Sequence, residues 1–348
     1  MNNDRIQEIL DLMEEARLDY FLISDPQSIA YCTGYYNDPH ERMFVFMISK
    51  HGNHTLFMND LFYLDHDLDV NIVWHKDGQD AIQTIVDEMH FPGRIGIDKN
   101  WASHFLLDLM KKLPDAKYIN ASPCVDLVRM KKDLQEQVLM IESSKINDAV
   151  MEEIIPFIQE GVTEKQLAKK LDELFFNHHS TCYGAIVAFG KNAADPHHEN
   201  DDTLLRKGDC VLIDMGCVYK GYCSDMTRTF FYEGILEEEI KVYEIVKKAN
   251  EAAEAMIKPG VKLSDIDKCA RKVISDEGYG KYFTHRLGHF IGRDVHEYGD
   301  VSSVNEMEVE EGMIFSIEPG IYLEGNFGVR VEDGCQVLNS FTKDIYII

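Results

Sequence analysis

The sequence is poor in basic residues relative to acidic ones, and this imbalance excludes several kinds of partner. Of its 348 residues, 35 are Lys or Arg and 61 are Asp or Glu, which gives a formal net charge of −26 at pH 7. Nucleic acids and anionic lipid surfaces would repel such a chain. We therefore expect neither a nucleic acid nor a membrane as a partner, and we interpret the acidic excess as a solvated surface.

Three other patterns are missing. No apolar run approaches the roughly 20 residues that a membrane-spanning helix needs. The first ten residues form an acidic amphipathic pattern without the basic-then-apolar order of a secretory signal. The eight cysteines form no CxxC pair and do not follow the pattern of a disulfide-rich secreted domain. We therefore expect a cytoplasmic protein.

The two parts of the chain differ in pattern, which predicts two domains. Residues 1–125 alternate strand-like apolar runs with helical patterns, which is typical of an α/β layer domain. We place the second domain at residues 126–348. The strands expected in the first domain are 20–23, 43–48, 55–57, 71–74 and 94–97, and the helices are 4–17, 79–90 and 101–113.

The second domain contains an internal repeat. Residues 208–221 superpose on residues 312–325 at an offset of 104, which aligns three glycines. Residues 160–167 resemble residues 259–266 at an offset of 99. We interpret this as a duplicated helix–helix–hairpin unit with a pseudo-two-fold axis; chance agreement between glycine-rich turns is the alternative. The expected helices are 136–158 and 163–176 in the first half, and 237–257 and 264–277 in the second.

Each half also supplies a hairpin that carries two carboxylates. Asp214 and Asp225 lie symmetrically about Tyr219–Lys220, and Glu318 and Glu332 about the last glycine of the second segment. Such partners face each other across an antiparallel ladder, with Cβ atoms ~5 Å apart. Four buried carboxylates would repel one another unless cations held them together. Two divalent metals that share carboxylates form a hydrolase site.

A histidine in a turn rich in His and Gly, His289, is expected to supply the one nitrogen ligand. The five segments around these residues, in chain order, resemble the ligand motifs of the pita-bread metallopeptidases. The family includes methionine aminopeptidases, proline dipeptidases (prolidases) and aminopeptidase P. The resemblance covers about residues 135–348, and the preceding half resembles the amino-terminal domain of the prolidase-type members. The five segments are Leu-Ile-Asp214-Met-Gly, Ser-Asp225-Met-Thr-Arg-Thr, Leu-Gly-His289-Phe-Ile-Gly, Ser-Ile-Glu318-Pro-Gly-Ile-Tyr and Val-Arg-Val-Glu332-Asp-Gly.

The resemblance implies the fold, the cofactors and the assembly. The fold would be α+β, with an N-terminal α/β creatinase-like domain and a C-terminal pita-bread domain, and the protein would be a homodimer. Each chain would bind two divalent metal ions. Asp214 would hold one metal, His289 and Glu318 the other, and Asp225 and Glu332 would bridge them. An oxygen-rich site with one imidazole suits manganese, with cobalt, iron or zinc as alternatives.

The resemblance also extends to residues beyond the expected ligands. His197 and His296 match two family histidines that bind substrate, while His285, Arg330 and Tyr322 match residues shared by prolidases and aminopeptidase P. A single His would otherwise be interpreted as an ordinary surface or core side chain. The whole set favours proline-directed enzymes over methionine aminopeptidases.

The expected reaction is cleavage of the Xaa-Pro bond at the N-terminus of short peptides, by a dipeptidase or by an enzyme of the aminopeptidase P type. A metal-activated hydroxide would attack the carbonyl, with Glu318 as the general base. His197 and His296 would bind the substrate and stabilise the tetrahedral intermediate. The alternatives are another aminopeptidase or hydrolase on the same scaffold, and a non-catalytic peptide-binding module, which the intact set of five ligands disfavours.

Two positions depart from the family pattern. Phe290 follows the expected His ligand where the family usually has Gly, and we expect it to narrow a wall of the pocket. The family commonly has Pro soon after the second His-Glu pair, whereas this chain continues to Asp300 without one. These departures concern the choice of substrate, because neither removes a ligand.

Overall fold

The computed structural model describes residues 1–64, 66–334 and 343. The chain folds into two compact units, Met1–Arg129 and Met130–Ile348, which we call unit 1 and unit 2 and describe separately. Over the described residues, no helix has both the length and the apolar character that crossing a membrane requires.

Helix α5 (Ser122–Met130) closes unit 1. Its residues Cys124, Val125 and Val128 pack into a core of this unit, so the chain leaves unit 1 only at the end of the helix. The domain boundary that we placed between residues 125 and 126 falls inside α5.

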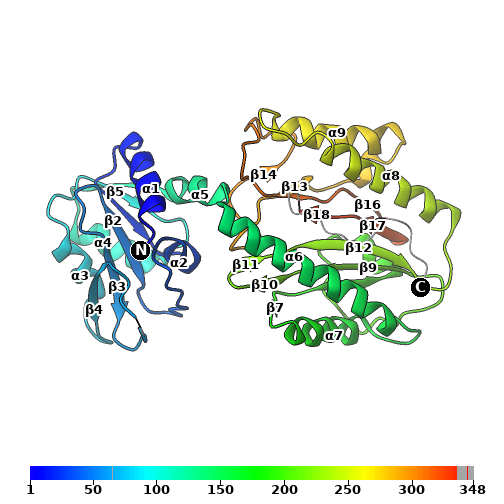
Figure 1. The fold of residues 1–348 in the computed structure, drawn as a ribbon, viewed down its shortest axis with the longest axis horizontal. Coiled ribbons are helices and arrows are strands. Elements are labelled where there is room, and N and C mark those ends of the chain that lie inside the picture. The colour runs from blue at the N-terminus through cyan, green and yellow to red at the C-terminus, as the bar shows by residue number, and fades with distance from the viewer. Residues whose placement is uncertain (65, 335–342, 344–348) are drawn as a thin grey trace. The chain divides into compact units, whose positions relative to one another are not determined.

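Unit 1 is a six-stranded sheet with helices on both faces (Figure 1). The strand order is β4-β3-β2-β1-β5-β6, in which β1 with β2 and β2 with β3 are antiparallel and the other neighbours are parallel. Besides α5, its elements are α1 Asn3–Glu15, β1 Tyr20–Ile23, α2 Pro26–Thr33, β2 Val45–Ser49, β3 Thr55–Asn59, β4 Asn71–His75, α3 Ala81–Glu88, β5 Arg94–Ile97, α4 Ser103–Lys112 and β6 Lys117–Asn120.

Successive residues of the central strand β1 enter two different cores. Phe21 and Ile23 pack with α1, α2 and α5, whereas Tyr20 and Leu22 pack with α3 and α4. Side chains of a strand alternate between its faces, and a strand that is buried on both faces has a continuous apolar run. The predicted α/β layer architecture is confirmed, although α2, β6 and α5 were not predicted.

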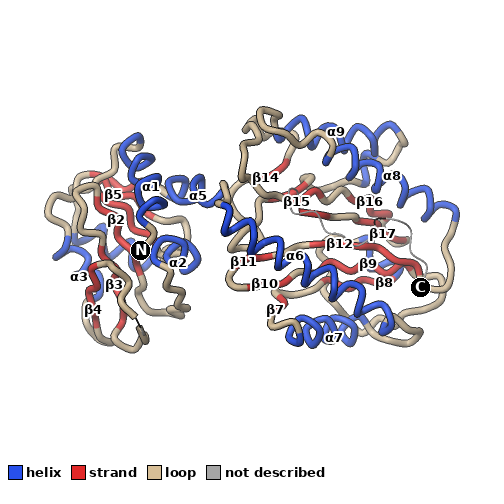
Figure 2. The backbone as a smooth tube through the Cα atoms, viewed as in Figure 1, coloured by secondary structure: helices blue, strands red, loops and turns tan. Residues whose placement is uncertain are grey.

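Unit 2 consists of two helix pairs and a set of short antiparallel strands. Figure 2 shows the strands gathered between the α8–α9 pair and α7, with α6 running across them. The helices are α6 Leu134–Ile154, α7 Glu164–Asn177, α8 Glu237–Glu254 and α9 Leu263–Asp276, with 3₁₀ turns η1 Ile155–Phe157, η2 Gly190–Ala194 and η3 Gly280–Tyr282. The strands are β7 Thr181–Cys182, β8 Ile186–Phe189, β9 Cys210–Met215, β10 Cys217–Tyr219, β11 Tyr222–Cys223, β12 Met226–Phe231, β13 Gly288–His289, β14 Asp300–Val301, β15 Ser316–Ile317, β16 Gly320–Leu323, β17 Phe327–Arg330 and β18 Asp333–Gly334.

Local sequence signals explain where the first helix pair begins. Helix α6 starts at a capping box in which Asp133 accepts the Glu136 N–H and the Glu136 carboxylate accepts the Asp133 N–H. Helix α7 starts in the same way with Thr163 and Gln166. These caps satisfy N–H groups that have no partner within the helix.

The duplication is confirmed by backbone hydrogen bonds that recur in both halves of unit 2. In each half, the segment that enters the second helix pairs with the segment before the ligand-bearing strands. The donors and acceptors are related by the same offsets, 99 and 104, that align the sequence repeats. The matched N–H to O=C pairs are Gly161 to Leu205 and Gly260 to Val309, Leu205 to Val162 and Val309 to Val261, Glu164 to Thr203 and Leu263 to Met307, and Lys165 to Asp201 and Ser264 to Asn305.

The registers of the two hairpins differ from each other. In the second half, Ile317 pairs with Asp333 and Gly320 with Arg330, so Glu318 lies opposite Glu332, as predicted. In the first half, Asp214 pairs with Thr227.

The prediction that Asp214 lies directly opposite Asp225 is therefore wrong. The turn is centred on Lys220 and Gly221, whose φ values of 49° and 82° are both positive. Two such residues form the tight turn that suits a two-residue hairpin loop. The turn centre lies one residue later than we assumed. Asp225 therefore lies just beyond the end of the ladder that contains Asp214.

Candidate metal centre

Short strands of both halves hold the five expected ligands in place. Asp214 lies in β9, Asp225 directly before β12, His289 in β13, Glu318 directly after β15 and Glu332 directly before β18. The neighbouring residues Ile213, Ile317 and Val331 are completely buried. Because these neighbours are fixed in the core, the carboxylates and the imidazole have little freedom to move apart.

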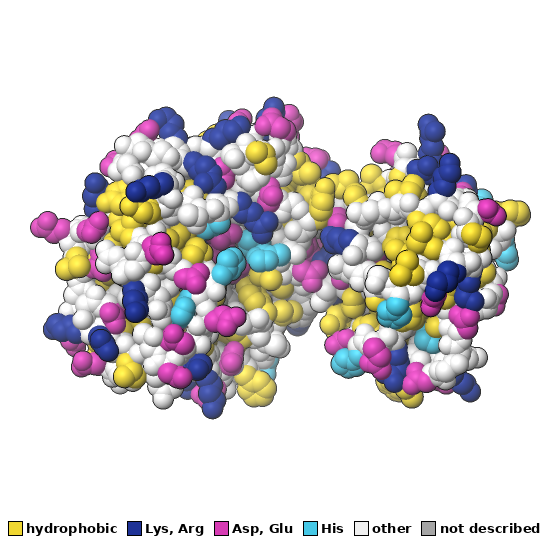
Figure 3. All heavy atoms as spheres, turned by 180° about the vertical axis from the view of Figure 1, so that it is seen from behind, with side chains coloured by type: hydrophobic (Ala, Val, Ile, Leu, Met, Phe, Trp, Pro, Cys, Tyr) yellow, Lys and Arg dark blue, Asp and Glu magenta, His cyan; other side chains and the backbone are white. Residues whose placement is uncertain are grey.

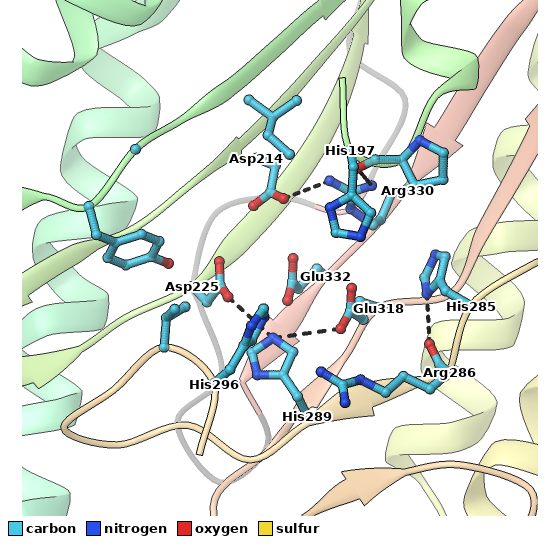
Figure 4. Close-up of a pocket in the computed structure, with 15 residues that line it drawn as sticks. His197, Asp214, Asp225, His285, Arg286, His289, His296, Glu318, Arg330 and Glu332 are labelled. Atoms are coloured by element: carbon cyan, nitrogen blue, oxygen red, sulfur yellow. Dashed lines mark hydrogen bonds and ion pairs between the residues drawn. The ribbon is translucent and has the colours of Figure 1, made fainter. Parts of the chain in front are cut away.

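The five side chains line one cavity of unit 2. Figure 4 shows the four carboxylates directed toward a common space, and Figure 3 shows histidine side chains gathered in a hollow on the surface of this unit. The residues that line the cavity are Tyr183, Gly184, Ile186, Pro196, His197, Asp214, Asp225, His285, Arg286, His289, Val295, His296, Glu318, Arg330 and Glu332.

The distances between these groups are short enough for a common cation. His289 Nε2 lies 3.5 Å from Asp225 Oδ2 and 3.6 Å from Glu318 Oε1. Asp225, His289 and Glu332 each offer one ligand atom, and these atoms lie within 4.8 Å of one another. The side chains of His289, Asp225 and Glu318 are only 4%, 9% and 16% exposed. The cluster is therefore compact and shielded from water.

The tautomer of His289 suits a metal ligand. Its Nδ1 lies 3.2 Å from the Phe290 carbonyl oxygen, which can only accept, so Nδ1 carries a proton. This leaves Nε2 directed at Asp225 and Glu318. A backbone acceptor on one ring nitrogen is the arrangement that orients metal-ligating imidazoles. Without a cation, burial acts to lower the pKa of His289, but the hydrogen bond to Asp225 and the charge of Glu318 raise it overall.

Glu332 has an unsatisfied oxygen. Its Oε2 accepts a hydrogen bond of 2.7 Å from Thr227 Oγ1, whereas its buried Oε1 has no partner among the residues that the structure describes. Burial, followed by the charges of Asp225 and Glu318, raises the pKa of Glu332 well above its ordinary value. A buried oxygen without a protein partner is suited to bind a cation.

Burial also raises the pKa of two other carboxyl groups of the cluster, those of Glu318 and Asp214. The pKa of Glu318 rises to about 7, although His289 opposes the shift. The pKa of Asp214 is raised in spite of the nearby Arg330 charge. Divalent cations would reverse these shifts, because they favour the ionised carboxylates. The donor set of four carboxylates and one inward-facing imidazole therefore fits a centre for divalent metals.

A chain of hydrogen bonds supports one side of the cavity. Arg330 is 3% exposed on its side chain and donates to Asp214 Oδ2 at 2.6 Å and to the Tyr322 hydroxyl at 3.0 Å. His285 Nδ1 donates to the Arg286 carbonyl at 2.7 Å, so Tyr322 donates its own proton to His285 Nε2 at 2.8 Å. Burial, followed by the Arg330 charge, lowers the pKa of His285 to about 4 and keeps the ring neutral at pH 7.

Two more histidines line the cavity, and they come from different loops. His197 follows η2, and His296 follows β13 by seven residues. The His296 ring packs edge-on against His289, with centroids 4.2 Å apart. Burial and the neighbouring His289 lower the pKa of His296 to about 4, so its ring is also neutral at pH 7. A neutral imidazole can donate a hydrogen bond to an oxygen of a bound ligand.

The structure brings together nearly all the residues expected at the site. All five expected ligands line the cavity, as do His197, His285, His296 and Arg330. Tyr322 does not line it; it lies behind Arg330 and His285 and acts on the cavity through them.

The expectation that Phe290 narrows the pocket wall is wrong. Phe290 is completely buried, packs against Phe315 with ring centroids 5.4 Å apart and does not line the cavity. Its ring fills the space beside Gly299, where an added Cβ would lie 2.7 Å from it. Asp300 also lies outside the cavity lining; it pairs with His289 in the β13–β14 ladder and accepts from Ser302.

One charged residue of the cavity was not predicted. Arg286 lines it, and within the described part of the chain its guanidinium makes no hydrogen bond or ion pair. The signal was its place between His285 and His289. Tyr183 was also missed, and it approaches from β7 with its hydroxyl donating to the Ser224 carbonyl at 2.8 Å.

A centre of this composition on a duplicated helix–helix–hairpin fold defines a metallopeptidase. Residues 138–339 match the model of metallopeptidase family M24, and residues 5–131 match the creatinase/prolidase N-terminal domain. The chain belongs to metallopeptidase family M24, in its two-domain creatinase/prolidase form, and this family implies the binding of divalent metal.

Individual relatives agree with this assignment over nearly the whole chain. The chain is 34% identical to an uncharacterized peptidase of Staphylococcus aureus (strain bovine RF122 / ET3-1) over 344 residues, which are 96% of each protein. It is similar to the crystal structure of a dipeptidase from Pyrococcus horikoshii OT3, with a TM-score of 0.92, 34% identity and coverage of 99% of this chain and 100% of that one. The structure of a recombinant prolidase from Thermococcus sibiricus gives a TM-score of 0.92, 31% identity and coverage of 100% and 99%.

Proposed function

We propose that this metallopeptidase cleaves the Xaa-Pro bond of short peptides, with Xaa-Pro dipeptides as the preferred substrates. The observation that carries the proposal is the cavity in which four carboxylates and the inward-facing Nε2 of His289 converge. The likeness to proteins described as a dipeptidase and a prolidase supports the substrate class.

Asp214, Asp225, His289, Glu318 and Glu332 would hold two divalent metals, for which manganese is the first candidate and cobalt, iron and zinc are alternatives. When bound, such ions lower the pKa of a water molecule toward neutrality and polarise a peptide carbonyl. The chain's own residues carry the remaining steps. The carboxylate of Glu318, which faces the cavity, accepts the proton of the attacking water and returns it to the leaving nitrogen.

His197 and the neutral ring of His296 donate hydrogen bonds to the oxygen on which charge develops. The proline nitrogen of the scissile bond carries no hydrogen. The substrate therefore offers no N–H donor at this bond for the site to recognise. Recognition must then come from the shape of the ring and from groups at either end of the substrate.

Arg286 supports the preference for dipeptides. Its guanidinium lines the cavity without a hydrogen bond or ion pair inside the described chain. In a dipeptide the residue after the scissile bond ends in a free carboxylate, and the exposed guanidinium of Arg286 can pair with it through two parallel N–H donors. In a longer peptide that carboxylate is displaced from the proline.

The test compares three substrates with purified protein loaded with manganese. We expect an Xaa-Pro dipeptide to be cleaved faster than the matching Xaa-Pro tripeptide, and a Met-Ala peptide to be cleaved slowest. Faster cleavage of the tripeptide would assign an enzyme of the aminopeptidase P type. Cleavage of Met-Ala alone would reject the preference for proline.

Homodimer formation and a cytoplasmic location remain predictions. Sedimentation of the purified protein would test the first, and fractionation of cells would test the second.

A further inference from the structure

A completely buried carboxylate, Glu164, lies beside the loop that carries His197. Glu164 is the first residue of α7, and all four of its hydrogen-bond donors come from residues 189–201. Its Oε1 accepts from the Phe189 N–H at 2.8 Å and from Asn192 Nδ2 at 2.9 Å. Its Oε2 accepts from His198 Nε2 at 2.6 Å and from the Asp201 N–H at 3.0 Å. One carboxylate therefore ties down both ends and the middle of this loop.

The second half of the repeat shows that the fold itself does not need this carboxylate. The residue matched to Glu164 is Leu263, which is equally buried. The backbone N–H groups of both residues make matched hydrogen bonds, to Thr203 and to Met307. Because an apolar side chain supports the same junction of helix and strand, the buried charge in the first half must serve something else. Burying a carboxylate is costly unless its partners compensate.

The arrangement of His197 and His198 in this loop indicates the role of the Glu164 carboxylate. His198 turns toward Glu164 and its side chain is 12% exposed, whereas the adjacent His197 lines the cavity. Figure 4 shows the His197 ring in the cavity close to Asp214 and Arg330. The Arg330 guanidinium also reaches the Pro196 carbonyl at 3.5 Å, so the loop is supported from both sides of His197.

We propose that Glu164, acting through His198 and the 189–201 backbone, is a positioning residue for His197. The proposal rests on the proposed function, in which His197 donates to the substrate oxygen. Without the carboxylate, the loop would lose the hydrogen bonds that fix the position and orientation of the His197 ring. A displacement of about 1 Å in such a donor can lower the rate about a hundredfold.

A cation site is the competing interpretation of Glu164, His198 and Asp201, since one potential ligand atom of each lies within 4.8 Å of the others. The hydrogen bonds argue against it. Each Glu164 oxygen already accepts two N–H groups, and an ion placed there would face the hydrogens of these donors. The cluster is thus satisfied as a structural clamp.

The test begins with Glu164→Leu, which installs the residue of the second half. We expect kcat on an Xaa-Pro dipeptide to fall about 10- to 100-fold with a smaller change in KM, because His197 acts mainly where charge develops. The same substitution in a His197→Ala background should lower kcat/KM by less than about twofold, since residues that act as a unit are not additive. Glu173→Gln, on the exposed side of the same helix, serves as the matched control and should leave kcat unchanged.

A second pair of variants covers the case in which Glu164→Leu fails to fold. His198→Gln keeps an N–H donor on a flexible side chain, and His198→Leu removes it. We expect His198→Leu to lower kcat as Glu164→Leu does, and His198→Gln to recover at least about a third of the loss on a logarithmic scale.

Hydrogen exchange separates this proposal from the proposed function. In metal-free protein, Glu164→Leu or His198→Leu should speed amide exchange in residues 189–203 by about tenfold or more, whatever the substrate of the enzyme. Unchanged exchange in that segment would overturn the clamp. An equal loss of kcat/KM in the wild-type and His197→Ala backgrounds would overturn the action through His197. Faster exchange in a protein without Xaa-Pro activity would reject the proposed function alone.

Discussion

The two halves of unit 2 have matched backbones but place different side chains at matched positions. The hairpins correspond at an offset of 104, yet Asp214 of the first half is held by Arg330, whereas Glu318 of the second half faces His289 without such a partner. The helix entries correspond at an offset of 99, yet one carries Glu164 and the other Leu263. The matched backbones of the two halves form one cavity. The side chains that differ give the two halves different chemical roles in it.

The chemical difference is clearest in the protonation of the two carboxyls. Burial raises the pKa of both, but the adjacent Arg330 opposes the shift of Asp214 directly, whereas the pKa of Glu318 rises to about 7. We interpret the first half as a fixed ligand position and the second as the position that exchanges protons. The following predictions test this division.

The largest effect is expected from neutralising the matched carboxylates. Glu318→Gln should lower kcat by about 10³-fold or more, because it removes both an expected ligand and the proton acceptor. Asp214→Asn should lower it less, about 10- to 100-fold, and extra metal should restore part of the activity. Steady-state kinetics across a metal titration measures both. Equal, metal-independent losses would remove the distinction between the halves.

The stability of the metal-free protein should depend on pH through the second half. The pKa of Glu318 is about 7 in the folded protein against 4.5 for the free group, so folding favours its protonated form. Its contribution to stability is complete below pH ~4.5 and is lost as the pH rises to about 7. We expect a loss of about 3 kcal/mol in the free energy of unfolding over this window, measured as the difference between wild type and Glu318→Gln.

Two comparisons sharpen that stability prediction. Surface carboxylates contribute equally to both proteins and cancel in the difference. Saturating manganese should abolish the pH dependence, because it favours the ionised side chain. A wild-type protein that becomes more stable than Glu318→Gln as the pH rises would contradict the sign of the shift.

A matched pair of glycines tests how tightly each ligand strand is packed. A Cβ on Gly216 would lie 2.0 Å from the Ser224 carbonyl oxygen and 1.9 Å from the Tyr183 hydroxyl, whereas on Gly320 it would meet the Tyr322 side chain at 2.4 Å. We expect Gly216→Ala to destabilise by about 3 kcal/mol and Gly320→Ala by about 1 to 2 kcal/mol, because backbone yields less than a side chain. Chemical denaturation measures the difference, and the reverse order would show that the first strand is the more adaptable.

The smallest effect is expected at the turns before these strands. Gly208 and Gly312 have φ values of 87° and 88°, so Ala is strained at both. No atom within 4 Å meets a Cβ on Gly208, whereas the Lys132 carbonyl oxygen lies 3.0 Å from one on Gly312. We expect Gly208→Ala to cost about 1 kcal/mol and Gly312→Ala somewhat more. Thermal unfolding resolves the difference, and equal shifts would show that the contact yields freely.

The sequence predicted most of the fold because the signals were local or repeated. The four helices of unit 2 and the second hairpin followed from apolar periodicity and from the two offsets. Helix α2 was missed although it has an Asp25–Pro26 start and a Gly34 stop, because its apolar run is short. The first hairpin was misplaced by one residue at the turn, since Lys220 adopts a positive φ that its residue type does not indicate.

The sequence pointed to the expected ligands and to one supporting chain, Arg330, Tyr322 and His285, but not to the other supports of the site. The expected ligands occur in motifs with a fixed order, so the sequence reveals them. The contact between Glu164 and His198 joins residues 34 positions apart and follows no spacing rule. The Phe290 ring points into the space beside Gly299, and no sequence pattern predicts that space. Contacts of this kind are set by tertiary packing.

The central claim is that the two halves together hold two divalent metals whose presence enables peptide cleavage. The most direct measurement is a calorimetric titration of metal-free protein with manganese, with hydrolysis of an Xaa-Pro dipeptide followed on the same samples. We predict two ions per chain, with activity that rises with their binding and is absent under chelator. Failure to bind manganese at saturation, or full cleavage of the dipeptide in the presence of chelator, would contradict the account.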